Sequence, residues 1–409
     1  MSGGVKGWCP SLLRPMQAAD GWLLRVKPPA GRIAGGVAKA LAARARQAGK
    51  GQLELTQRGA LQLRGLAAET LEPLARWAIA QGLAVADPAL EARRNILVSP
   101  LADSDPSLLG APLQVAATLE AGLAARSGLA ALPDKFGFLV DGGGLLPLET
   151  ASTDIVLRLA EGRLELAGKV AVALPARCDQ AVIALDLAEA FVMLAAGERL
   201  RMASLLERRG AAALLEAAGL ASDHSLLPSS EAARPAPGFY RYPGQSLGAI
   251  LAAWPFGALD SSALARAAAL ALRQGDGDLR LTPWRALALT GIPERRAEAV
   301  LTGLAAAGAL VEPAAPLLRI EACPGLGACG EATVDTRSLA RALARRIGPG
   351  TRRLHVSGCA KGCAHPAASD VTLVGEAGRW NLVRRGRAGD RPDRDGLTRD
   401  EALEVAGHA

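Results

Sequence analysis

The sequence predicts an α+β fold in which two half-domains are related by a pseudo-twofold axis. Three observations support this prediction. The chain has 409 residues, more than one hydrophobic core of the usual size of roughly 100–150 residues would use. It contains one internal repeat of two copies. The segments between and after the copies alternate between strand-like and helix-like patterns.

The repeat appears when the sequence is compared with itself at an offset of 226 residues, where residues 21–87 match residues 247–313 without a gap. Matched pairs include Gly49 with Gly275, Thr56 with Thr282, and Gly65 with Gly291. Two copies at this distance do not make a solenoid, so we expect two half-domains that pair about a twofold axis.

Each copy predicts a β-α-β-α unit: an apolar strand, an alanine-rich helix, an alternating strand after a glycine turn, and a second helix. In the first copy these elements are predicted at Gly21–Val26, Ile33–Ala48, Gln52–Arg64 and Glu69–Gln81. In the second copy they are predicted at Ala249–Ala253, Ser261–Gln274, Asp278–Thr290 and Glu294–Ala307.

The segment between the copies predicts short strands, a long helical region rich in alanine and leucine, and a linker rich in serine and proline. The strands are predicted at Asn95–Ser99, Ile155–Leu159, Arg163–Leu166 and Val170–Leu174, and the linker at Ser222–Gly238. The C-terminal segment predicts a helix at Asp335–Arg346, capped by Asp335 or Thr336, and strands at Arg353–Ser357 and Asp370–Val374.

Composition excludes several classes of protein. Hydrophobic residues make up 50% of the chain and charged residues 21%, which excludes a disordered chain. No run approaches the roughly 20 apolar residues of a membrane-spanning helix, and residues 1–30 lack a secretory signal pattern, so we expect a cytoplasmic protein with no membrane partner. Aromatic residues are only 3%, and no dense basic tract contains them, which argues against a nucleic-acid partner.

Arginine dominates the basic residues. The net charge of +7 comes from 47 basic and 40 acidic residues, and only seven of the basic residues are lysines. Because arginine binds carboxylates and phosphates through two parallel hydrogen bonds, this composition suits a polyanionic ligand. For the scattered arginines, a biased nucleotide composition is the favoured explanation, since alanine and glycine are abundant too.

Four of the six cysteines lie in two glycine-flanked pairs, Cys323 with Cys329 and Cys359 with Cys363. In a cytosolic chain such pairs favour a metal or iron–sulfur site over disulfides, because thiolates on tight loops can converge. Five residues separate the first pair, more than the usual two to about four of zinc knuckles. A four-iron cluster is therefore favoured over the two alternatives, a structural zinc ion and buried free thiols.

A comparable loop follows each copy of the repeat, at Arg93–Pro100 after the first and at Ile320–Pro324 after the second. The first loop presents cations and the second presents thiolates. We therefore expect a single site at the pseudo-twofold axis that binds a polyanion on one side and a cluster on the other.

Several motifs together resemble the sulfite and nitrite reductase hemoprotein superfamily over nearly the whole chain. They are Leu55-Thr56-Gln57-Arg58 with Gln62 and Arg64, then Arg94-Asn95, Lys135, and the two cysteine pairs. The resemblance implies two ferredoxin-like half-domains, related by the internal pseudo-twofold repeat, and two α/β hemoprotein-type domains around a central cleft. The half-domains are predicted at residues 1–90 and 236–315, the first α/β domain at 91–235, and the second, which binds the iron–sulfur cluster, at 316–409.

The same resemblance implies roles for individual residues. The cysteines Cys323, Cys329, Cys359 and Cys363 match the ligands of a [4Fe–4S] cluster, and Cys363 matches the one that bridges to sirohaem iron. The basic residues that match those facing the substrate anion, and that we predict as catalytic, are Arg58, Arg94 and Lys135. Residues predicted to bind substrate are Arg25, Arg58, Gln62, Arg64, Arg94 and Asn95; among them Gln62 and Arg64 match positions that help to hold the carboxylates of the macrocycle.

One departure from the reductases is informative. They carry a second lysine two residues after the one that matches Lys135, where this chain has Gly137. Loss of one cation weakens the electrostatic push that deoxygenates sulfite or nitrite. Within the superfamily, the segments Cys323–Cys329, Ser357–Pro366 and Lys135–Phe138 are most similar to the precorrin-3B synthases.

That similarity implies an O2-dependent monooxygenase of aerobic cobalamin biosynthesis, which hydroxylates precorrin-3A at C20 and closes a γ-lactone. The implied cofactors are a [4Fe–4S] cluster and a mononuclear non-haem iron, with NADH as electron source through a separate reductase. The implied partners are precorrin-3A, a tetrapyrrole polycarboxylate, O2, and an electron-donor protein such as ferredoxin or a reductase. Two alternatives stay open: a sirohaem-dependent sulfite or nitrite reductase, and a non-catalytic protein with a structural zinc site.

The ligands of the mononuclear iron are left open. Non-haem oxygenase sites usually combine two histidines with a carboxylate, and this chain has four histidines. His365, two residues after Cys363, is the best candidate by position, although a hydrogen bond within the cluster loop explains it equally well. His355 fits a packed strand, while His224 lies in the predicted linker and His408 next to the last residue.

Overall fold

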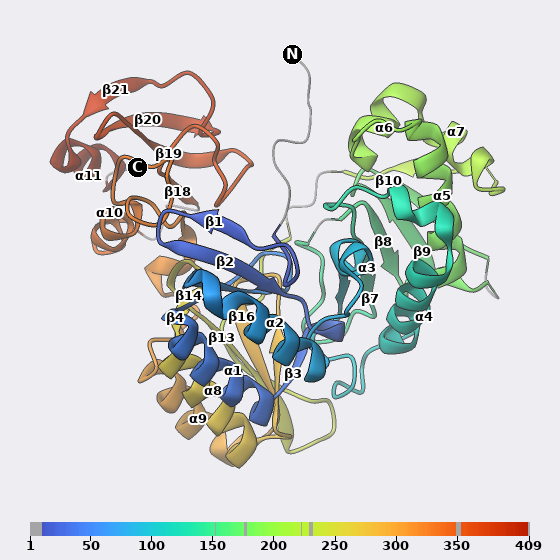
Figure 1. Cartoon of the computed structure of the whole chain (residues 1–409), viewed down its shortest axis with the longest axis horizontal. Helices are drawn as coiled ribbons and strands as arrows, with labels where there is room; N and C mark the ends of the chain where they lie inside the picture. The colour runs from blue at the N-terminus through green and yellow to red at the C-terminus, as the bar shows by residue number, and fades with distance from the viewer. Residues whose placement is uncertain are drawn as a thin grey trace.

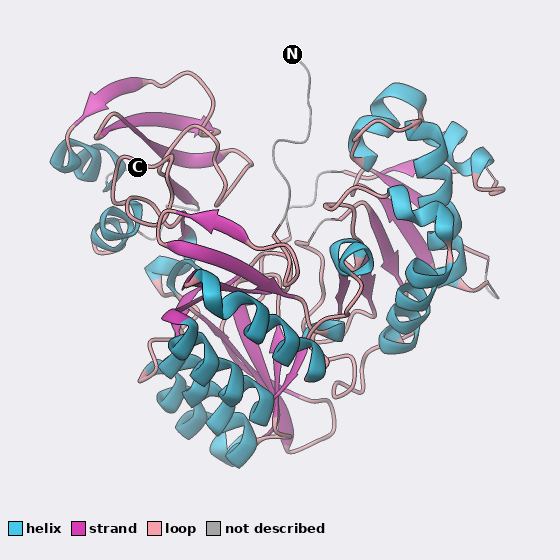
Figure 2. Cartoon of the chain, in the orientation of Figure 1, coloured by secondary structure: helices cyan, strands magenta, loops and turns pink. Residues whose placement is uncertain are grey.

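The structure, a computed structural model, describes residues 10–151, 153–175, 178–221, 223–228, 232–348 and 353–407. These residues form three lobes in Figure 1: a lower lobe in blue and yellow-orange, an upper right lobe in green, and an upper left lobe in red. Four sheets organise the lobes, and Figure 2 shows the helices on the outer sides of the strands.

The first half-domain is a five-stranded sheet in the order β1 (Met16–Ala18), β2 (Gly21–Val26), β5 (Leu61–Leu66), β4 (Gly49–Leu55) and β14 (Ala258–Asp260). Neighbouring strands are antiparallel. Two helices, α1 (Gly35–Ala48) and α2 (Leu71–Ala80), bury their apolar residues in the same core as one face of this sheet.

The second half-domain repeats this arrangement. Its five strands are ordered β12 (Gly238–Arg241), β13 (Leu247–Ala253), β16 (Ala286–Pro293), β15 (Asp278–Leu281) and β3 (Arg32–Ala34). The helices α8 (Ser261–Gln274) and α9 (Ala297–Ala305) contribute to the same core.

The two half-domains exchange their edge strands. β14 comes from the second copy of the repeat and pairs with β4 of the first, while β3 comes from the first copy and pairs with β15 of the second. The helices α1 and α8 contact each other, so both copies share one hydrophobic core. The predicted pseudo-twofold pairing is confirmed, and each half-domain takes one edge strand of its sheet from the other copy.

The predicted unit was wrong in one respect. The segments Gln52–Arg64 and Asp278–Thr290 are each a hairpin, not one strand, so the unit is β-α-β-β-α. In the first hairpin the turn is closed by Thr56, whose N–H donates to the carbonyl of Ala60 at 2.9 Å and whose Oγ1 accepts from the N–H of Ala60 at 3.1 Å. The leucines before and after the turn all fall on alternate residues of one continuous pattern, so the sequence pattern of the two strands is the same as that of a single long strand. The first helix also begins at Gly35, since Arg32–Ala34 forms the exchanged strand.

Alternation along the strands gives the first sheet two unlike faces. Leu24, Leu53 and Leu63 point into the shared core, whereas Arg25 and Gln62 point to the other side, where they line a cavity. Arg25 and Gln62 lie directly opposite each other on β2 and β5.

The second sheet has apolar residues at the equivalent positions. The counterparts of Arg25 and Gln62, 226 residues later, are Leu251 and Ala288. Both are buried in a cluster with Leu139 of the neighbouring α/β domain. The two halves therefore keep the same fold but use their outer faces differently, one for a cavity and one for packing.

The first α/β domain is a six-stranded sheet in the order β11 (Ser225–Leu226), β10 (Val170–Ala173), β9 (Arg163–Leu166), β8 (Ile155–Arg158), β7 (Phe138–Asp141) and β6 (Ile96–Val98). The strands β6, β7 and β8 are parallel and the others antiparallel. β11 lies inside the predicted linker, so part of that segment extends the sheet. Its helices are α3 (Pro88–Arg93), α4 (Pro112–Ala125), α5 (Gln180–Ala195), α6 (Met202–Arg209) and α7 (Ala211–Ala217).

The C-terminal domain is a five-stranded sheet in the order β17 (Ile320–Ala322), β18 (Leu354–Ser357), β19 (Ser369–Glu376), β20 (Arg379–Gly386) and β21 (Arg394–Leu397). The first three strands are parallel. The helices α10 (Thr336–Leu343) and α11 (Arg399–Gly407) cover one face. Asp335, one of the two predicted caps, accepts a hydrogen bond from the N–H of Ser338 at 3.1 Å. Short 3-10 turns are η1 (Pro29–Gly31), η2 (Ala68–Thr70), η3 (Ser127–Ala131), η4 (Pro255–Gly257), η5 (Glu294–Arg296) and η6 (Pro316–Arg319).

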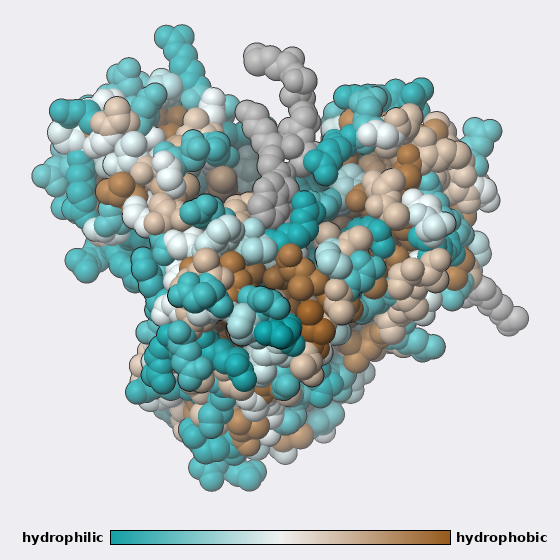
Figure 3. Space-filling view, in the orientation of Figure 1, coloured by the Kyte–Doolittle hydropathy of each residue, from teal (hydrophilic) through white to brown (hydrophobic). Residues whose placement is uncertain are grey.

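The predicted fold class is confirmed: an α+β protein with two ferredoxin-like half-domains and two α/β domains around a central cleft. The exact domain boundaries stay predictions. Figure 3 shows hydrophilic residues over the outer helices of the lower lobe, while apolar residues collect where the lower and right-hand lobes meet. None of the described helices combines the length and apolar character needed to cross a lipid bilayer.

His355 makes stability depend on pH. It lies on β18 with no exposed surface, facing Glu321, Arg285 and His365, and burial together with the charge of His365 lowers its pKa from 6.5 to about 4. As the pH falls from 6.5 to 4, His355 binds a proton in the unfolded chain but stays neutral in the folded chain. The free energy of unfolding should therefore fall by about 3 kcal/mol over this interval. Urea unfolding at a series of pH values measures this loss.

The matched variants are His355→Phe, which cannot titrate, and His224→Phe, which replaces an exposed histidine. We expect His355→Phe to flatten the profile in this interval and His224→Phe to leave it unchanged. A profile that keeps its full slope in His355→Phe would assign the pH dependence to other groups.

Candidate active site

A cavity of about 950 Å³ lies where the first half-domain, the second half-domain and the C-terminal domain meet. All four paired cysteines line it: Cys323, Cys329, Cys359 and Cys363. Its other wall is the polar face of the first sheet, with Arg25, Gln62 and Arg64. Arg58 lines the same cavity, so the structure brings the predicted cluster ligands and four predicted substrate residues to one space.

The two cysteine loops meet because β17 and β18 are parallel. Cys323 follows the end of β17, and Gly358 follows the end of β18, at the same edge of the sheet. The N–H of Gly358 donates to Cys323 Sγ at 3.1 Å. The hydroxyl of Thr336, in the first turn of α10, donates to the carbonyl of Cys323 at 2.6 Å, and that of Ser357 donates to the carbonyl of Cys359 at 2.7 Å. Hydrogen bonds therefore fix the backbone of both loops at their first cysteine.

The four thiols lie close enough to influence one another. Burial raises the pKa of Cys363, and the charges of Cys359, Cys323 and Cys329 raise it further, while Lys361 opposes the shift. None of the cysteines in the described residues forms a disulfide. Within the same residues, no three His, Cys, Asp or Glu side chains converge closely enough to hold one metal ion. The two loops thus bring four cysteine side chains to the wall of one cavity.

Three buried hydrogen-bond donors in the cavity wall lack partners within the described part of the chain: Arg25 Nε, Gln57 Nε2 and Arg337 Nε. A buried donor without a partner costs roughly 1–3 kcal/mol, so each needs an explanation such as a bound ligand or water. Because all three are donors, the cavity suits a ligand that is rich in acceptor oxygens.

Arg64 is already paired. Its guanidinium binds the buried carboxylate of Asp20 through two hydrogen bonds of 3.0 and 3.2 Å, and it donates to the carbonyl of Ala328 at 2.8 Å. Ala328 precedes Cys329 in the first cysteine loop. This hydrogen bond ties Arg64 to that loop, and its contact with substrate stays a prediction.

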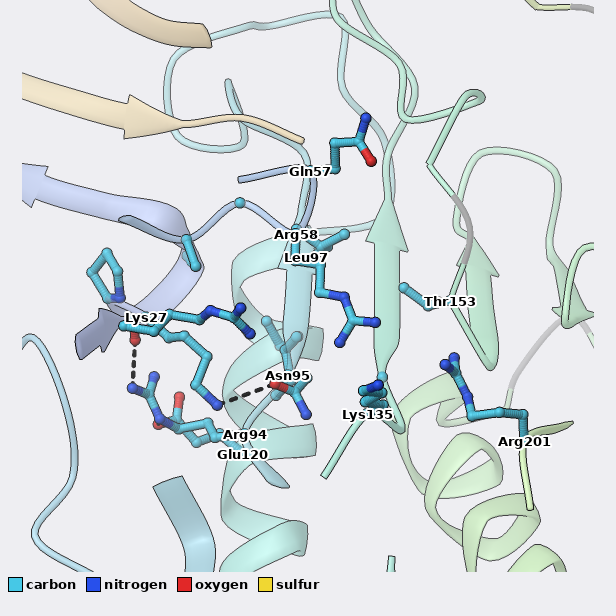
Figure 4. Close-up of a pocket in the computed structure, with 18 residues that line it drawn as sticks. Lys27, Gln57, Arg58, Arg94, Asn95, Leu97, Glu120, Lys135, Thr153 and Arg201 are labelled. Carbon is cyan, nitrogen blue, oxygen red and sulfur yellow. Dashed lines mark hydrogen bonds and ion pairs between the residues drawn. The ribbon is translucent and has the colours of Figure 1, made fainter. Parts of the chain in front are cut away.

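A second, smaller cavity of about 80 Å³ holds the predicted catalytic cations. Figure 4 shows the side chains of Arg58, Lys135 and Arg201 pointing into the same space. Arg58 and Gln57 also line the cavity of about 950 Å³ that holds the four cysteines, which we call the large cavity. They line a third cavity too, of about 1030 Å³, which lies against Arg158, Trp284 and His365. The turn that carries Arg58 therefore stands at the junction of three cavities.

Arg94 and Asn95 are engaged in supporting contacts. Arg94 is buried and pairs with Glu91 at 3.0 Å and Glu120 at 3.4 Å. The amide of Asn95 donates to the carbonyls of Asp134 at 3.0 Å and Phe136 at 2.9 Å, on both sides of Lys135. Both residues line the small cavity, and Asn95 fixes the backbone that presents Lys135.

Sequence reasoning missed Arg201. It follows the alanine and leucine region, far from every motif, and no local signal marks it. Its guanidinium binds Asp154 through two hydrogen bonds of 3.0 and 2.7 Å, and the N–H of Gly137 donates to the same carboxylate at 3.1 Å. The structure thus places an arginine beside the glycine that stands where reductases have their second lysine.

His355 and His365 are stacked edge to face with ring centroids 5.9 Å apart. His355 is the packed strand residue that the sequence predicts. The nearest carboxylate across the strands, Glu321, is held between Arg234 and Arg285, and these guanidinium groups keep its pKa low although burial alone would raise it. A carboxylate already neutralised by two arginines is a poor iron ligand, so the described residues do not fit a mononuclear site here. His408 lies outside the described residues, and His224 is exposed.

Comparisons with known proteins agree with this geometry. The nitrite/sulfite reductase ferredoxin-like half domain matches the chain twice, at residues 14–77 and 249–307. A precorrin-3B synthase from Sinorhizobium sp is 31% identical over 400 residues, covering 95% of this chain and 84% of the relative. A ferredoxin–nitrite reductase from Synechococcus elongatus is 26% identical, covering 90% of this chain and 78% of the relative. The structure of the Mycobacterium tuberculosis NirA protein has the same fold, with a TM-score of 0.74 at 18% identity over 94% of this chain and 79% of that one.

Replacing Arg64 should be costly for folding. Arg64→Met leaves the carboxylate of Asp20 buried without its partner, so we expect the free energy of unfolding to fall by about 3 kcal/mol. Arg76→Met is the matched control, because it removes an exposed pair with Glu72 that contributes at most about 0.5 kcal/mol. Urea unfolding of the two variants compares them directly, and equal midpoints would show that the Asp20 pair does not stabilise the fold.

Proposed function

Because this chain belongs to the precorrin-3B synthases, a family within the nitrite and sulfite reductase superfamily, we propose that it oxidises precorrin-3A to precorrin-3B. The reaction hydroxylates C20 and closes a γ-lactone from the ring A acetate. One atom of O2 enters the product and the other leaves as water, with two electrons supplied by NADH through a separate reductase.

The observation that carries this proposal is the unpartnered donors of the large cavity, Arg25 Nε, Gln57 Nε2 and Arg337 Nε. Precorrin-3A carries eight carboxylates, which are the acceptors that such donors need. A cavity of about 950 Å³ has the size of sites that enclose large ligands. A charge-assisted hydrogen bond contributes about 1.5–3 kcal/mol before desolvation is subtracted, so two or three of them fix the orientation of the ring.

Orientation is what the reaction demands of this site, since only one carbon of the macrocycle is hydroxylated. We assign direct substrate contacts to Arg25, Arg58 and Gln62, which line the cavity from the first sheet and its turn. Arg64, Arg94 and Asn95 support them, because their polar groups already bind Asp20, Glu91 and the backbone around Lys135.

The four cysteines would hold a [4Fe–4S] cluster, which would supply electrons one at a time at the end of the large cavity. Lys135 and Arg58 face the small cavity and would stabilise the negative charge that develops as oxygen is reduced; the ammonium group of Lys135 is also able to donate a proton. A mononuclear iron has no ligand set among the described residues, so no step is assigned to it.

The direct test incubates anaerobically purified protein with precorrin-3A, NADH, a reductase and O2, and looks by mass spectrometry for a product heavier by one oxygen atom. We expect this product from the wild type and none from Cys363→Ser, because serine does not replace a cluster thiolate. The control Cys178→Ser changes a cysteine outside the cavity and should keep full activity. Absence of the product from wild-type protein that carries its cluster would overturn the proposal.

The visible spectrum and metal content of the same preparation separate the alternatives. A sirohaem-dependent reductase would show sirohaem bands. The observation that favours this second candidate is Arg201 beside Gly137, because it adds a cation to the small cavity. A structural zinc protein would contain zinc without iron or acid-labile sulfide. The proposed synthase should show the broad brown absorption of an iron–sulfur cluster alone.

Loss of Arg58 should weaken substrate binding. Because this guanidinium stands at the junction of the three cavities, Arg58→Met should raise the Kd for precorrin-3A at least about tenfold, the equivalent of one charge-assisted hydrogen bond. Anaerobic titration followed by tetrapyrrole absorbance measures the affinity. Arg266→Met, on the exposed face of α8, is the control, and an affinity equal to that control would remove Arg58 from the binding role.

A further inference from the structure

The two hairpin turns of the repeat differ at one strained position. Gly59 in the first turn has φ 60°, and Arg285, its counterpart 226 residues later, has φ 58°. Glycine adopts this left-handed conformation without steric cost, whereas a side chain with a Cβ does not. The second copy thus carries an arginine at a position where the backbone conformation favours glycine. The contacts of the arginine side chain must therefore compensate for the backbone strain.

The contacts of Arg285 provide this compensation. Its side chain is 13% exposed and forms an ion pair with Glu321, on the strand that leads to Cys323. Its other terminal nitrogen donates to the carbonyl of Ala364, the residue after Cys363, at 2.9 Å. One guanidinium therefore touches the approach to the first cysteine loop and the exit of the second.

The first half-domain makes a matching contact. Arg64 donates to the carbonyl of Ala328, the residue before Cys329, and is held by Asp20. Each cysteine loop is thus attached to a different half-domain by an arginine that binds a loop carbonyl and is itself oriented by a buried carboxylate. The two arginines are not repeat counterparts, because the residue equivalent to Arg64 is Thr290.

We propose that Arg285 is a positioning residue that fixes the Cys359–Cys363 loop against the second half-domain and thereby controls the retention and reduction potential of the cluster. This inference rests on the proposed cluster. A guanidinium fixed beside the last cysteine adds positive charge and keeps the loop carbonyl from moving, and both charge and hydrogen bonding around the sulfur ligands set the potential of such clusters.

The test uses the full chain, purified anaerobically, in three forms beside the wild type. Arg285→Gly restores the residue of the first copy and relieves the backbone while removing the anchor. Arg285→Lys keeps the charge and one donor. Arg385→Gly is the matched control, because Arg385 is also left-handed, with φ 46°, but is exposed and does not line the large cavity.

The measurements are the rate of cluster loss to an iron chelator and the reduction potential from a redox titration followed by electron paramagnetic resonance. Arg285→Gly should lose its cluster about tenfold faster than the wild type and show a lower potential, the usual scale for removing a residue that supports a metal ligand. Arg285→Lys should fall between the two, and Arg385→Gly should match the wild type.

A release rate and potential of Arg285→Gly equal to those of Arg385→Gly would overturn the inference. If Arg285→Gly does not yield folded protein, Arg285→Asn takes its place, because asparagine tolerates the left-handed conformation and is too short to reach both partners. Wild-type protein without iron and acid-labile sulfide overturns the cluster and this inference together. Wild-type protein with the cluster but without oxygenated product overturns the proposed reaction alone.

Discussion

The parallel pairing of β17 with β18 is the constraint on which the candidate site depends. Parallel strands end at the same edge of a sheet, so the chain leaves both strands side by side with a cysteine loop following each. The register pairs Ala322 with Val356, and this places the N–H of Gly358 within 3.1 Å of Cys323 Sγ. The crossover through α10 makes the parallel arrangement possible, and the hydroxyl of Thr336 on that helix holds the first loop. A slip of one residue would turn these contacts away from each other.

A symmetric scaffold produces an asymmetric cleft because the outer faces of its two sheets have diverged. Arg25 and Gln62 give the first sheet a polar face toward the cavity, whereas Leu251 and Ala288 give the second an apolar face that packs on the first α/β domain. Only one of the two faces is therefore available to a ligand. The inner faces did not diverge in this way, since both sheets share one core under α1 and α8, and exchange of edge strands ties each copy to the other.

The sequence predicts the features that depend on local residue patterns. It does not predict the features that depend on contacts between residues far apart in the chain. The repeat, the strands after it, the cap at Asp335 and the meeting of the cysteines follow from spacing and periodicity. The hairpin turns were missed because the leucines of β4 and β5 stay in phase across Thr56. The partners of Arg64 and Arg201 were missed because Asp20 and Asp154 lie 44 and 47 residues away from them along the chain, and nothing local links the charges. The role of Arg285 could not be predicted, because its left-handed backbone conformation is seen only in the structure.

Two groups of buried hydrogen-bond donors lie around the cavities, and the division between them has a physical cause. Arg64, Arg94 and Arg285 are buried or nearly so and each faces an internal carboxylate, because a desolvated guanidinium without a counter-charge would destabilise the fold. In each case the carboxylate orients the guanidinium, so these arginines hold loops and backbone in place. Arg25 and Gln57 instead keep a buried donor that no described residue satisfies. Leaving a buried donor without an acceptor is costly, and the proposed polycarboxylate would supply the acceptor oxygens that these donors need, so under the proposed function the unpaired donors would select the ligand.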